Sequence, residues 1–346
     1  MKNGNMNNER SEFKQVEKRL LEIYNRKNIP NKELYIATLK KINKVLKNEN
    51  VKTRPYDSLK LPGGIVLLRH DIPTIIIPDL HAREDFFINI LLYKDSTGYS
   101  NLQKLNLNML QIVCLGDGFH SEGLGAREFW KSALDEYKMS YDKHENMDKE
   151  MTKSLGLMEM VMEVKSAFPD NFNFLKGNHE NITNERKGGN FPFRKYAHEG
   201  AMVATYITKF YGKVFLEEYY MFEKNLPLIA IGKNIILSHA EPLKVYNRKS
   251  IIEYRSNPDV VRGLTWTSND EAEDGSVKEM LKYYLDDDEN AYYFSGHRPV
   301  NNLYKLRAKG KLVQINNSIK NVIAIIKKNK NIDLDRDIIK IVKKKL

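Results

Sequence analysis

The sequence predicts a layered fold of the α/β (α+β) class. Short apolar runs of strand length alternate with longer stretches of helical periodicity, and the chain ends in several strand-like runs. With 346 residues, 41% of them hydrophobic, the chain can bury a sizeable core. We therefore expect sheets and helices packed in layers, with further helices added to the main domain.

The first 60 residues differ from the rest in their hydrophobic pattern. Apolar residues recur at helical spacing over residues 10–50, with a break at Pro30, and predict a pair of accessory helices. From residue 61, turn residues separate a series of apolar runs. The predicted strands are 65–68, 74–77, 112–115, 172–175, 228–231, 235–237, 292–294, 303–306, 312–315 and 322–326, with a hairpin turn at 232–234. The predicted helical stretches are 127–141, 149–167, 201–222 and part of 269–290.

Charge and cysteine content restrict the kinds of partner and metal site that the chain can have. The net charge of +11 gathers at the ends: residues 1–60 carry 15 Lys or Arg against 7 Asp or Glu, and residues 307–346 carry 12 against 3. A basic chain invites a nucleic-acid partner, but lysines scattered without interleaved aromatics or a binding motif favour a solvated surface. The single cysteine, Cys114, excludes an internal disulfide and a cysteine-based zinc site.

Hydropathy along the chain predicts no association with a membrane. No apolar run approaches the length that crosses a bilayer. The N-terminus is polar and has no apolar core of a signal peptide. We therefore expect a cytoplasmic protein.

Polar residues able to bind metal follow five of the predicted strands. They are Asp79 and His81 after 74–77, Asp117 after 112–115, Asn178, His179 and Glu180 after 172–175, His239 after 235–237, and His297 after 292–294. Strand ends converge on one edge of a sheet, so these groups can share one site. Glycines beside Asp117, Asn178 and His297 allow the backbone to turn tightly there.

The chemistry of this set favours a transition-metal site. Carboxylates, imidazoles and an amide oxygen suit Mn, Fe or Zn, whereas structural zinc prefers cysteines and calcium prefers oxygens alone. Each motif by itself has a simpler interpretation, because a histidine after a strand is commonly a hydrogen-bonded core residue. The occurrence of all five motifs in order, each at a strand end, favours the metal site.

The motif order resembles that of the calcineurin-like metallophosphoesterase superfamily, which reads D-x-H, G-D, G-N-H-[DE], H and G-H. Within it, the chain is most similar to the PPP-type serine/threonine phosphatases and their bacterial relatives. This similarity extends beyond the motifs to the segments 168–180 and 225–242. The resemblance covers residues 61–328. It implies a metallophosphoesterase-type β-sandwich layered with helices, preceded by an N-terminal helical extension (1–60) and followed by a basic tail (329–346).

The resemblance also implies a centre of two divalent metals. Asp79 and His81 are the implied ligands of the first metal, and Asp117 is the implied bridge between the two metals. The implied ligands of the second metal are Asn178, His239 and His297. A water shared by the metals would become hydroxide near neutral pH and attack the phosphorus. His179 would be the catalytic acid that gives a proton to the departing oxygen.

Three departures from the family pattern bear on this site. In the second motif, His120 stands where the family has an acid that supports the catalytic histidine, and Ser121 stands where it has a phosphate-gripping arginine. Arg83 follows the first motif, and Glu241 follows His239. We hypothesise that His120 takes part in the reaction and that Arg83 grips phosphate in place of the missing arginine.

The predicted function is hydrolysis of a phosphate monoester, on a phosphoprotein or a small molecule. Arg255 precedes the segment that resembles the family's Trp-Ser signature, near where a phosphate-contacting arginine occurs in the family, and is a second candidate for substrate binding. Two alternatives stay open: a phosphodiesterase or dinucleoside polyphosphate hydrolase, and a non-catalytic binding scaffold on the same fold. Scaffolds are expected to lose metal ligands, and this chain keeps all six.

Overall fold

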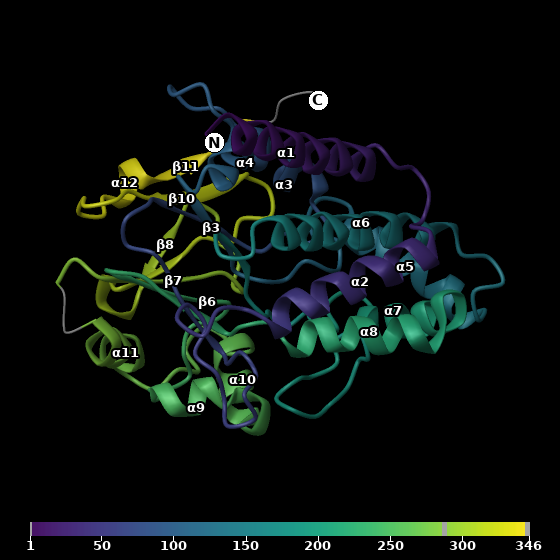
Figure 1. The fold of residues 1–346 in the computed structure, drawn as a ribbon. Helices are drawn as coiled ribbons and strands as arrows, with labels where there is room; N and C mark the ends of the chain where they lie inside the picture. The colour runs from purple at the N-terminus through teal and green to yellow at the C-terminus, as the bar shows by residue number, and fades with distance from the viewer. Residues whose placement is uncertain (1, 286–288, 343–346) are drawn as a thin grey trace.

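Two β-sheets form the centre of the protein in the computed structural model, which describes residues 2–285 and 289–342, with side chains from residue 13 (Figure 1). The first sheet has the strand order β11-β10-β2-β3-β4. Strands β2, β3 and β4 run parallel, and β10 pairs antiparallel with both β2 and β11. Their bounds are β2 (Thr74–Ile77), β3 (Gln111–Cys114), β4 (Phe172–Phe174), β10 (Val322–Ile326) and β11 (Ile338–Lys340).

The second sheet has the strand order β1-β5-β6-β7-β9-β8. Strands β5 and β6 form the predicted hairpin, β6, β7 and β9 run parallel, and β1 joins β5 in parallel. Strand β8 closes the other edge, antiparallel to β9. Their bounds are β1 (Ile65–Leu67), β5 (Ile229–Ile231), β6 (Ile235–Ser238), β7 (Tyr292–Ser295), β8 (Lys305–Arg307) and β9 (Leu312–Gln314).

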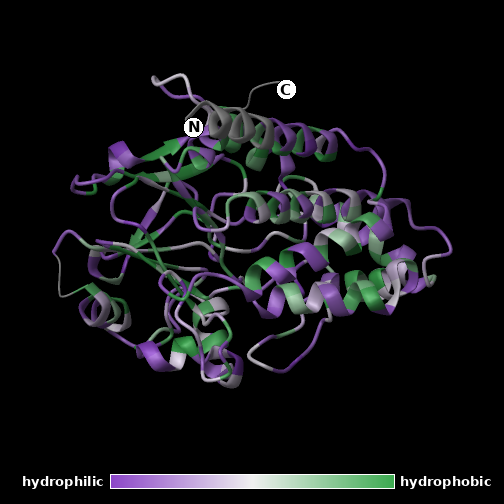
Figure 2. Cartoon of the chain, in the orientation of Figure 1, coloured by the Kyte–Doolittle hydropathy of each residue, from purple (hydrophilic) through white to green (hydrophobic). Residues whose placement is uncertain are grey.

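The two sheets pack face to face around an apolar core. This core takes Ile76 and Val113 from the first sheet and Leu237 and Phe294 from the second. Because successive residues of a strand point to opposite faces, Ile75 belongs instead to the core on the outer side of the first sheet. Apolar colouring accordingly runs along the central strands in Figure 2. The predicted sandwich of mixed α/β class is confirmed.

Helices cover the outer face of each sheet (Figures 1 and 2). The larger group, over the first sheet, comprises α1 (Lys2–Tyr24), α2 (Lys32–Lys47), α3 (Glu84–Leu92), α4 (Asn101–Asn106), α5 (Ala126–Lys138), α6 (Glu145–Ala167), α7 (Glu199–Tyr206) and α8 (Gly212–Lys224). The smaller group comprises α9 (Arg248–Ile252), α10 (Pro258–Thr265) and α11 (Ser276–Leu285). The protein therefore has four layers, with helices outside and sheets inside.

The N-terminal helices share the core on the outer side of the first sheet. Leu20 of α1 and Leu39 of α2 are fully buried in that core. Arg19 and Arg26 also reach the buried Glu159 of α6, with nitrogen–oxygen distances of 2.5 and 2.7 Å. The predicted helical pair is confirmed, while the domain boundary at residue 60 stays a prediction.

The sequence did not predict the helices α3, α4, α9 and α10, and two further segments differ from the sequence-based expectation. The stretch 201–222, expected as continuous helix, is interrupted by a π-helical turn at Ile207–Tyr211 and by Gly212, whose φ is +78°. Within the predicted basic tail, Ile338–Lys340 form β11, preceded by the short helix α12 (Leu334–Asp337). This edge strand forms because Ile338, only 1% exposed, packs into the core between the sheets.

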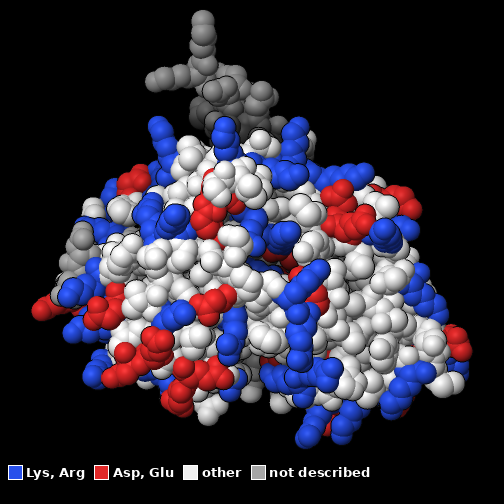
Figure 3. Space-filling view, turned by 90° about the horizontal axis from the view of Figure 1, so that it is seen from below, with Lys and Arg blue, Asp and Glu red and all other residues white. Residues whose placement is uncertain are grey.

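Charged side chains of both signs lie on the surface of the protein (Figure 3). Among the described residues, no helix is both long and apolar enough to cross a bilayer. On the face shown in Figure 3, Lys and Arg are interspersed with acidic and uncharged residues. Basic and acidic side chains are therefore mixed on this face.

A buried charge cluster ties the segment after α2 to α6. Glu49 lies between Arg54 and Lys165, and the three side chains are 6%, 1% and 5% exposed. Lys165 Nζ is 2.6 Å from one Glu49 oxygen, and the Arg54 guanidinium contacts the other. Burial alone would raise the pKa of Glu49, but the two cations lower it below its ordinary value.

Replacing this carboxylate should destabilise the whole fold. Glu49→Gln would leave two buried cations without a counter-charge, so we expect the free energy of unfolding to fall by about 3–5 kcal/mol in urea denaturation at pH 7. Because the folded pKa is lowered, the difference from wild type should shrink as the pH falls below about 4. Glu217→Gln, which breaks an exposed pair with Lys213, should cost at most about 1 kcal/mol. Equal effects of both variants would contradict this account.

Candidate metal centre

The six predicted metal ligands meet where the two sheets adjoin. Three loops after parallel strands β2, β3 and β4 and two loops after β6 and β7 carry them. His297 is half-buried and the other ligands are at most 4% exposed; the six are Asp79, His81, Asp117, Asn178, His239 and His297. Residues separated by more than two hundred positions in the chain thus share one buried site.

Four of these residues form the group predicted for the second metal. The amide oxygen Oδ1 of Asn178 lies 2.9 Å from His239 Nε2 and 3.0 Å from His297 Nδ1. Asp117 Oδ2 lies 3.3 Å from the same nitrogen of His239. Ligand atoms about 2.1 Å from one ion are separated by about 3.0–3.4 Å in octahedral or tetrahedral geometry. The spacing therefore suits a single cation.

A second group of donors adjoins the first and shares one carboxylate with it. Ligand atoms of Asp79, His81 and Asp117 lie within 4.8 Å of one another, as do those of Asp117, His239 and His297. His81 Nε2 is 3.7 Å from Asp79 Oδ2. Because Asp117 belongs to both groups, its position suits the bridging role that the resemblance implies.

Glu180 holds the loops that carry these ligands. Its two carboxylate oxygens accept backbone N–H bonds from Asp117, Gly118 and Gly177, at 2.9, 2.9 and 2.6 Å. Asp117 itself has a left-handed φ of +53°, which costs a non-glycine residue about 1–2 kcal/mol. The buried Glu180 carboxylate therefore fixes a strained backbone conformation at the shared ligand.

The motif glycines serve two different purposes. Gly116 has a φ of +104° and makes the tight turn expected from the sequence. Gly177 and Gly296 are required instead by close approach. A Cβ on Gly177 would lie 2.2 Å from Asp117 Oδ1, and one on Gly296 would lie 1.8 Å from Asp79 Oδ1.

Further polar contacts orient individual ligands. His239 Nδ1 donates to the carbonyl of Leu115 at 2.9 Å, which leaves Nε2 with a free lone pair toward the site. Asn316 donates to Asp79 Oδ2 at 2.6 Å. Sequence reasoning missed Glu180 as a clamp and Asn316 altogether, although both obey the same pattern of a polar residue after a strand.

The electrostatics of the site fit divalent cations. Burial raises the pKa of Asp117 well above its usual value, and the neighbouring Asp79 and Glu180 carboxylates raise it further. Burial, with His239 alongside, lowers the pKa of His297 to about 3. Imidazoles must be neutral to bind metal, and divalent cations would relieve the repulsion among the carboxylates. The donor set is therefore suited to metals in both charge and chemistry.

His179 and His120 contact each other directly. Their Nδ1 atoms are 3.0 Å apart, and His179 Nδ1 is also 3.1 Å from the carbonyl of Phe119. A carbonyl only accepts, so His179 Nδ1 carries the hydrogen and His120 Nδ1 accepts it. His179 Nε2 is left toward the metal ligands, 3.5 Å from Asp117 Oδ2. His120 thus lies behind His179 rather than among the metal ligands.

The guanidinium groups of the two candidate arginines, Arg83 and Arg255, are hydrogen-bonded to other parts of the protein. Arg83 donates to the backbone carbonyls of Asp79, Leu80 and Asn317, so its guanidinium is occupied. Burial lowers the pKa of Arg83 to about 10.

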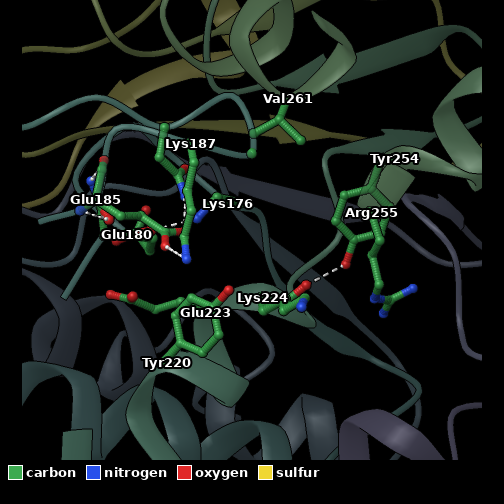
Figure 4. Close-up of a pocket in the computed structure, with 13 residues that line it drawn as sticks. Lys176, Glu180, Glu185, Lys187, Tyr220, Glu223, Lys224, Tyr254, Arg255 and Val261 are labelled. Carbon is green, nitrogen blue, oxygen red and sulfur yellow. Dashed lines mark hydrogen bonds and ion pairs between the residues drawn. The ribbon is translucent and has the colours of Figure 1, made fainter. Parts of the chain in front are cut away.

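Arg255 lines a separate cavity of about 280 Å³ that also contacts Lys176 and Glu180. Its guanidinium points away from those residues in Figure 4 and binds Asp57, Pro62 and Asn225.

Glu122 is an additional carboxylate that sequence reasoning did not assign. Its Oε2 lies 3.7 Å from His81 Nε2, and its ligand atom lies within 4.8 Å of those of His81 and His179. The side chain is 7% exposed and forms an ion pair with Lys195. Glu122 therefore adds negative charge at the edge of the first metal group.

Comparison with solved structures confirms the metallophosphoesterase fold. A protein serine/threonine phosphatase from Saccharomyces cerevisiae with similarity to human phosphatase PP5 superposes with a TM-score of 0.54 at 13% identity, over 90% of this chain and 89% of that chain. A cold-active protein-tyrosine phosphatase of a psychrophilic Shewanella species aligns at 14% identity over 81% and 82%, with a TM-score of only 0.47. No family model and no curated protein sequence matches the chain. The predicted resemblance to PPP-type phosphatases is thus confirmed at the level of the fold.

Weakening the Glu180 clamp should weaken metal binding. Glu180→Gln places an amide donor against backbone N–H groups, so we expect manganese or zinc affinity to fall about 10- to 100-fold in calorimetric titration of the metal-stripped protein. Glu185→Gln is the matched control, because Glu185 lies in the same loop but binds Lys187 and Asn190. Unchanged affinity in Glu180→Gln, or an equal loss in the control, would show that the clamp does not support the site.

Proposed function

We propose that the protein is a metal-dependent phosphoesterase that uses two divalent metals to hydrolyse a phosphate monoester. The observation that carries this proposal is the pair of donor groups sharing Asp117. The fold shared with a protein serine/threonine phosphatase supports it. Mn, Fe and Zn all suit these donors, since imidazole, carboxylate and amide oxygen are ligands common to them.

The metals, when bound, would supply an activated water and polarise the phosphoryl oxygens. His179 would donate to the departing oxygen through Nε2, the ring nitrogen that faces the ligands. Because Nδ1 also carries a hydrogen, the ring would act as an imidazolium that becomes neutral when the departing alkoxide takes the Nε2 proton. Its Nδ1–H is held by Phe119 O and His120 Nδ1, which keeps the ring oriented. In this proposal His120 positions His179, whereas the family uses an acid for that support.

The proposed substrate class has one alternative activity and one non-catalytic alternative. The phosphate would be carried by a phosphoprotein or a small molecule. A phosphodiesterase or dinucleoside polyphosphate hydrolase is the alternative activity. A binding scaffold is disfavoured, because buried metal donors at ligand spacing have no use in a surface that only binds a partner.

Metal analysis and a phosphate-release screen test the proposed function together. We expect about two equivalents of divalent metal per chain and turnover of 4-nitrophenyl phosphate in preference to its bis-ester and to dinucleoside polyphosphates. Removal of metal with a chelator should abolish turnover, and re-addition of manganese should restore it. Metal-loaded protein that releases phosphate from no ester would overturn the proposal.

The leaving group provides a specific test of His179. His179→Asn should lower turnover of an alkyl phosphate such as a phosphoserine peptide by about 10²–10⁴-fold, because an alkoxide needs a proton to depart. Turnover of 4-nitrophenyl phosphate, whose leaving group needs no proton, should fall much less. Metal content, measured in parallel, should not change. Equal losses on both substrates would exclude the role of His179 as an acid.

A further inference from the structure

A cavity of about 390 Å³ opens over the candidate metal centre. Metal ligands from both donor groups line it, and so do cationic and aromatic side chains. The ligands are His81, Asp117, Asn178 and His297, and the other lining residues include Glu122, Arg194, Lys195, Trp266 and Arg298. A substrate phosphate bound at the metals would therefore have these side chains around it.

Two residues that line this cavity each have a buried hydrogen-bond donor without an acceptor among the described residues. Among the described residues, the buried Nε of Arg298 and the buried indole Nε1 of Trp266 make no hydrogen bond. A buried donor without a partner costs about 1–3 kcal/mol, and more when it is charged. Both residues line the cavity that contains the metal ligands. Their position indicates a ligand with several acceptor oxygens.

Of the other cations near the centre, Arg194 also lines the cavity but is exposed at the surface, and two more are engaged elsewhere. Arg83 is occupied by three backbone carbonyls, and Lys195 forms an ion pair with Glu122. Arg298 directly follows His297, so its backbone lies about 3.8 Å from that of a metal ligand. Arg298 is therefore the guanidinium best placed to reach an anion held at the metals.

We propose that Arg298, assisted by the indole of Trp266, grips the phosphoryl oxygens and selects a dianionic phosphate monoester. This inference rests on the proposed function and names the substrate class and the residues that recognise it. A guanidinium binds two oxygens of a phosphate at once through its planar fork. A terminal phosphate offers three free oxygens and two charges, whereas a diester offers two oxygens and one charge. Three donors, two from Arg298 and one from Trp266, match the terminal phosphate.

The test measures anion binding as well as catalysis. We expect Arg298→Gln to weaken binding of inorganic phosphate to the metal-loaded protein about 10- to 100-fold by calorimetry, the loss typical of a charged hydrogen bond. The kcat/KM for 4-nitrophenyl phosphate should fall by a similar factor, while that for bis(4-nitrophenyl) phosphate should fall less than about threefold. Arg298→Lys, which keeps the charge but lacks the fork, should recover only part of the loss.

Two more variants distinguish phosphate binding by Arg298 and Trp266 from a general effect of lost positive charge. Trp266→Phe keeps the ring and removes the donor, so phosphate affinity should fall roughly 2- to 10-fold. Arg186→Gln removes an exposed positive charge that does not line the cavity and should leave phosphate affinity unchanged. Metal content and melting temperature, measured for every variant, should match wild type.

The outcomes distinguish this inference from the proposed function. Unchanged phosphate affinity in Arg298→Gln, or equal losses of kcat/KM for monoester and diester, would overturn the proposed role of Arg298 even if the wild type is an active phosphatase. If the wild type binds phosphate but hydrolyses no ester, loss of phosphate binding in Arg298→Gln would support the role of Arg298 and contradict the proposed function.

Discussion

Burial of four carboxylates around one point is the constraint on which the rest of this structure depends. Asp79, Asp117 and Glu180 are at most 2% exposed, and the Glu122 side chain is 7% exposed. Three of the four have strong protein partners: Asn316 for Asp79, three backbone N–H groups for Glu180, and Lys195 for Glu122. Asp117 accepts a hydrogen bond from the backbone N–H of His179, at 3.0 Å. The carboxylate with the least support from the protein is the one shared by both donor groups, which is where cations would compensate it.

The sandwich makes this concentration of charge possible. The ligands come from loops after strands of both sheets, and the apolar core between the sheets holds those strand ends in place. Close approach at Gly177 and Gly296 and the left-handed backbone of Asp117 leave little freedom for the loops to separate. Folding and metal binding are therefore expected to be coupled, since the donors meet only when both sheets are formed.

The differences from the motif pattern that the sequence resembles lie beside the six candidate ligands rather than among them. His120 lacks the negative charge of an acid, but its Nδ1 contacts the ring of His179. Ser121 has no guanidinium, and the guanidinium of Arg83 donates to the backbone carbonyls of Asn317 and Asp79. In our proposals, the phosphate is recognised by Arg298, in the loop after β7 of the second sheet. Phosphate hydrolysis would thus use a different arginine beside the metal ligands.

The sequence alone predicted the strands other than β11, the hairpin and the six candidate donors, because a short apolar run and a polar residue at its end are local patterns. It also placed Glu180 in a motif without indicating what its carboxylate binds. Only the tertiary structure decided the roles of Arg83, Arg255 and Glu180, since their partners include Asn317, Asp57 and Asp117, which are distant in the chain. A long polar side chain can reach several partners, and which one it meets depends on how the sheets and loops pack. That packing is a global property, so residue type and spacing could predict the donors but not the hydrogen bonds that hold them.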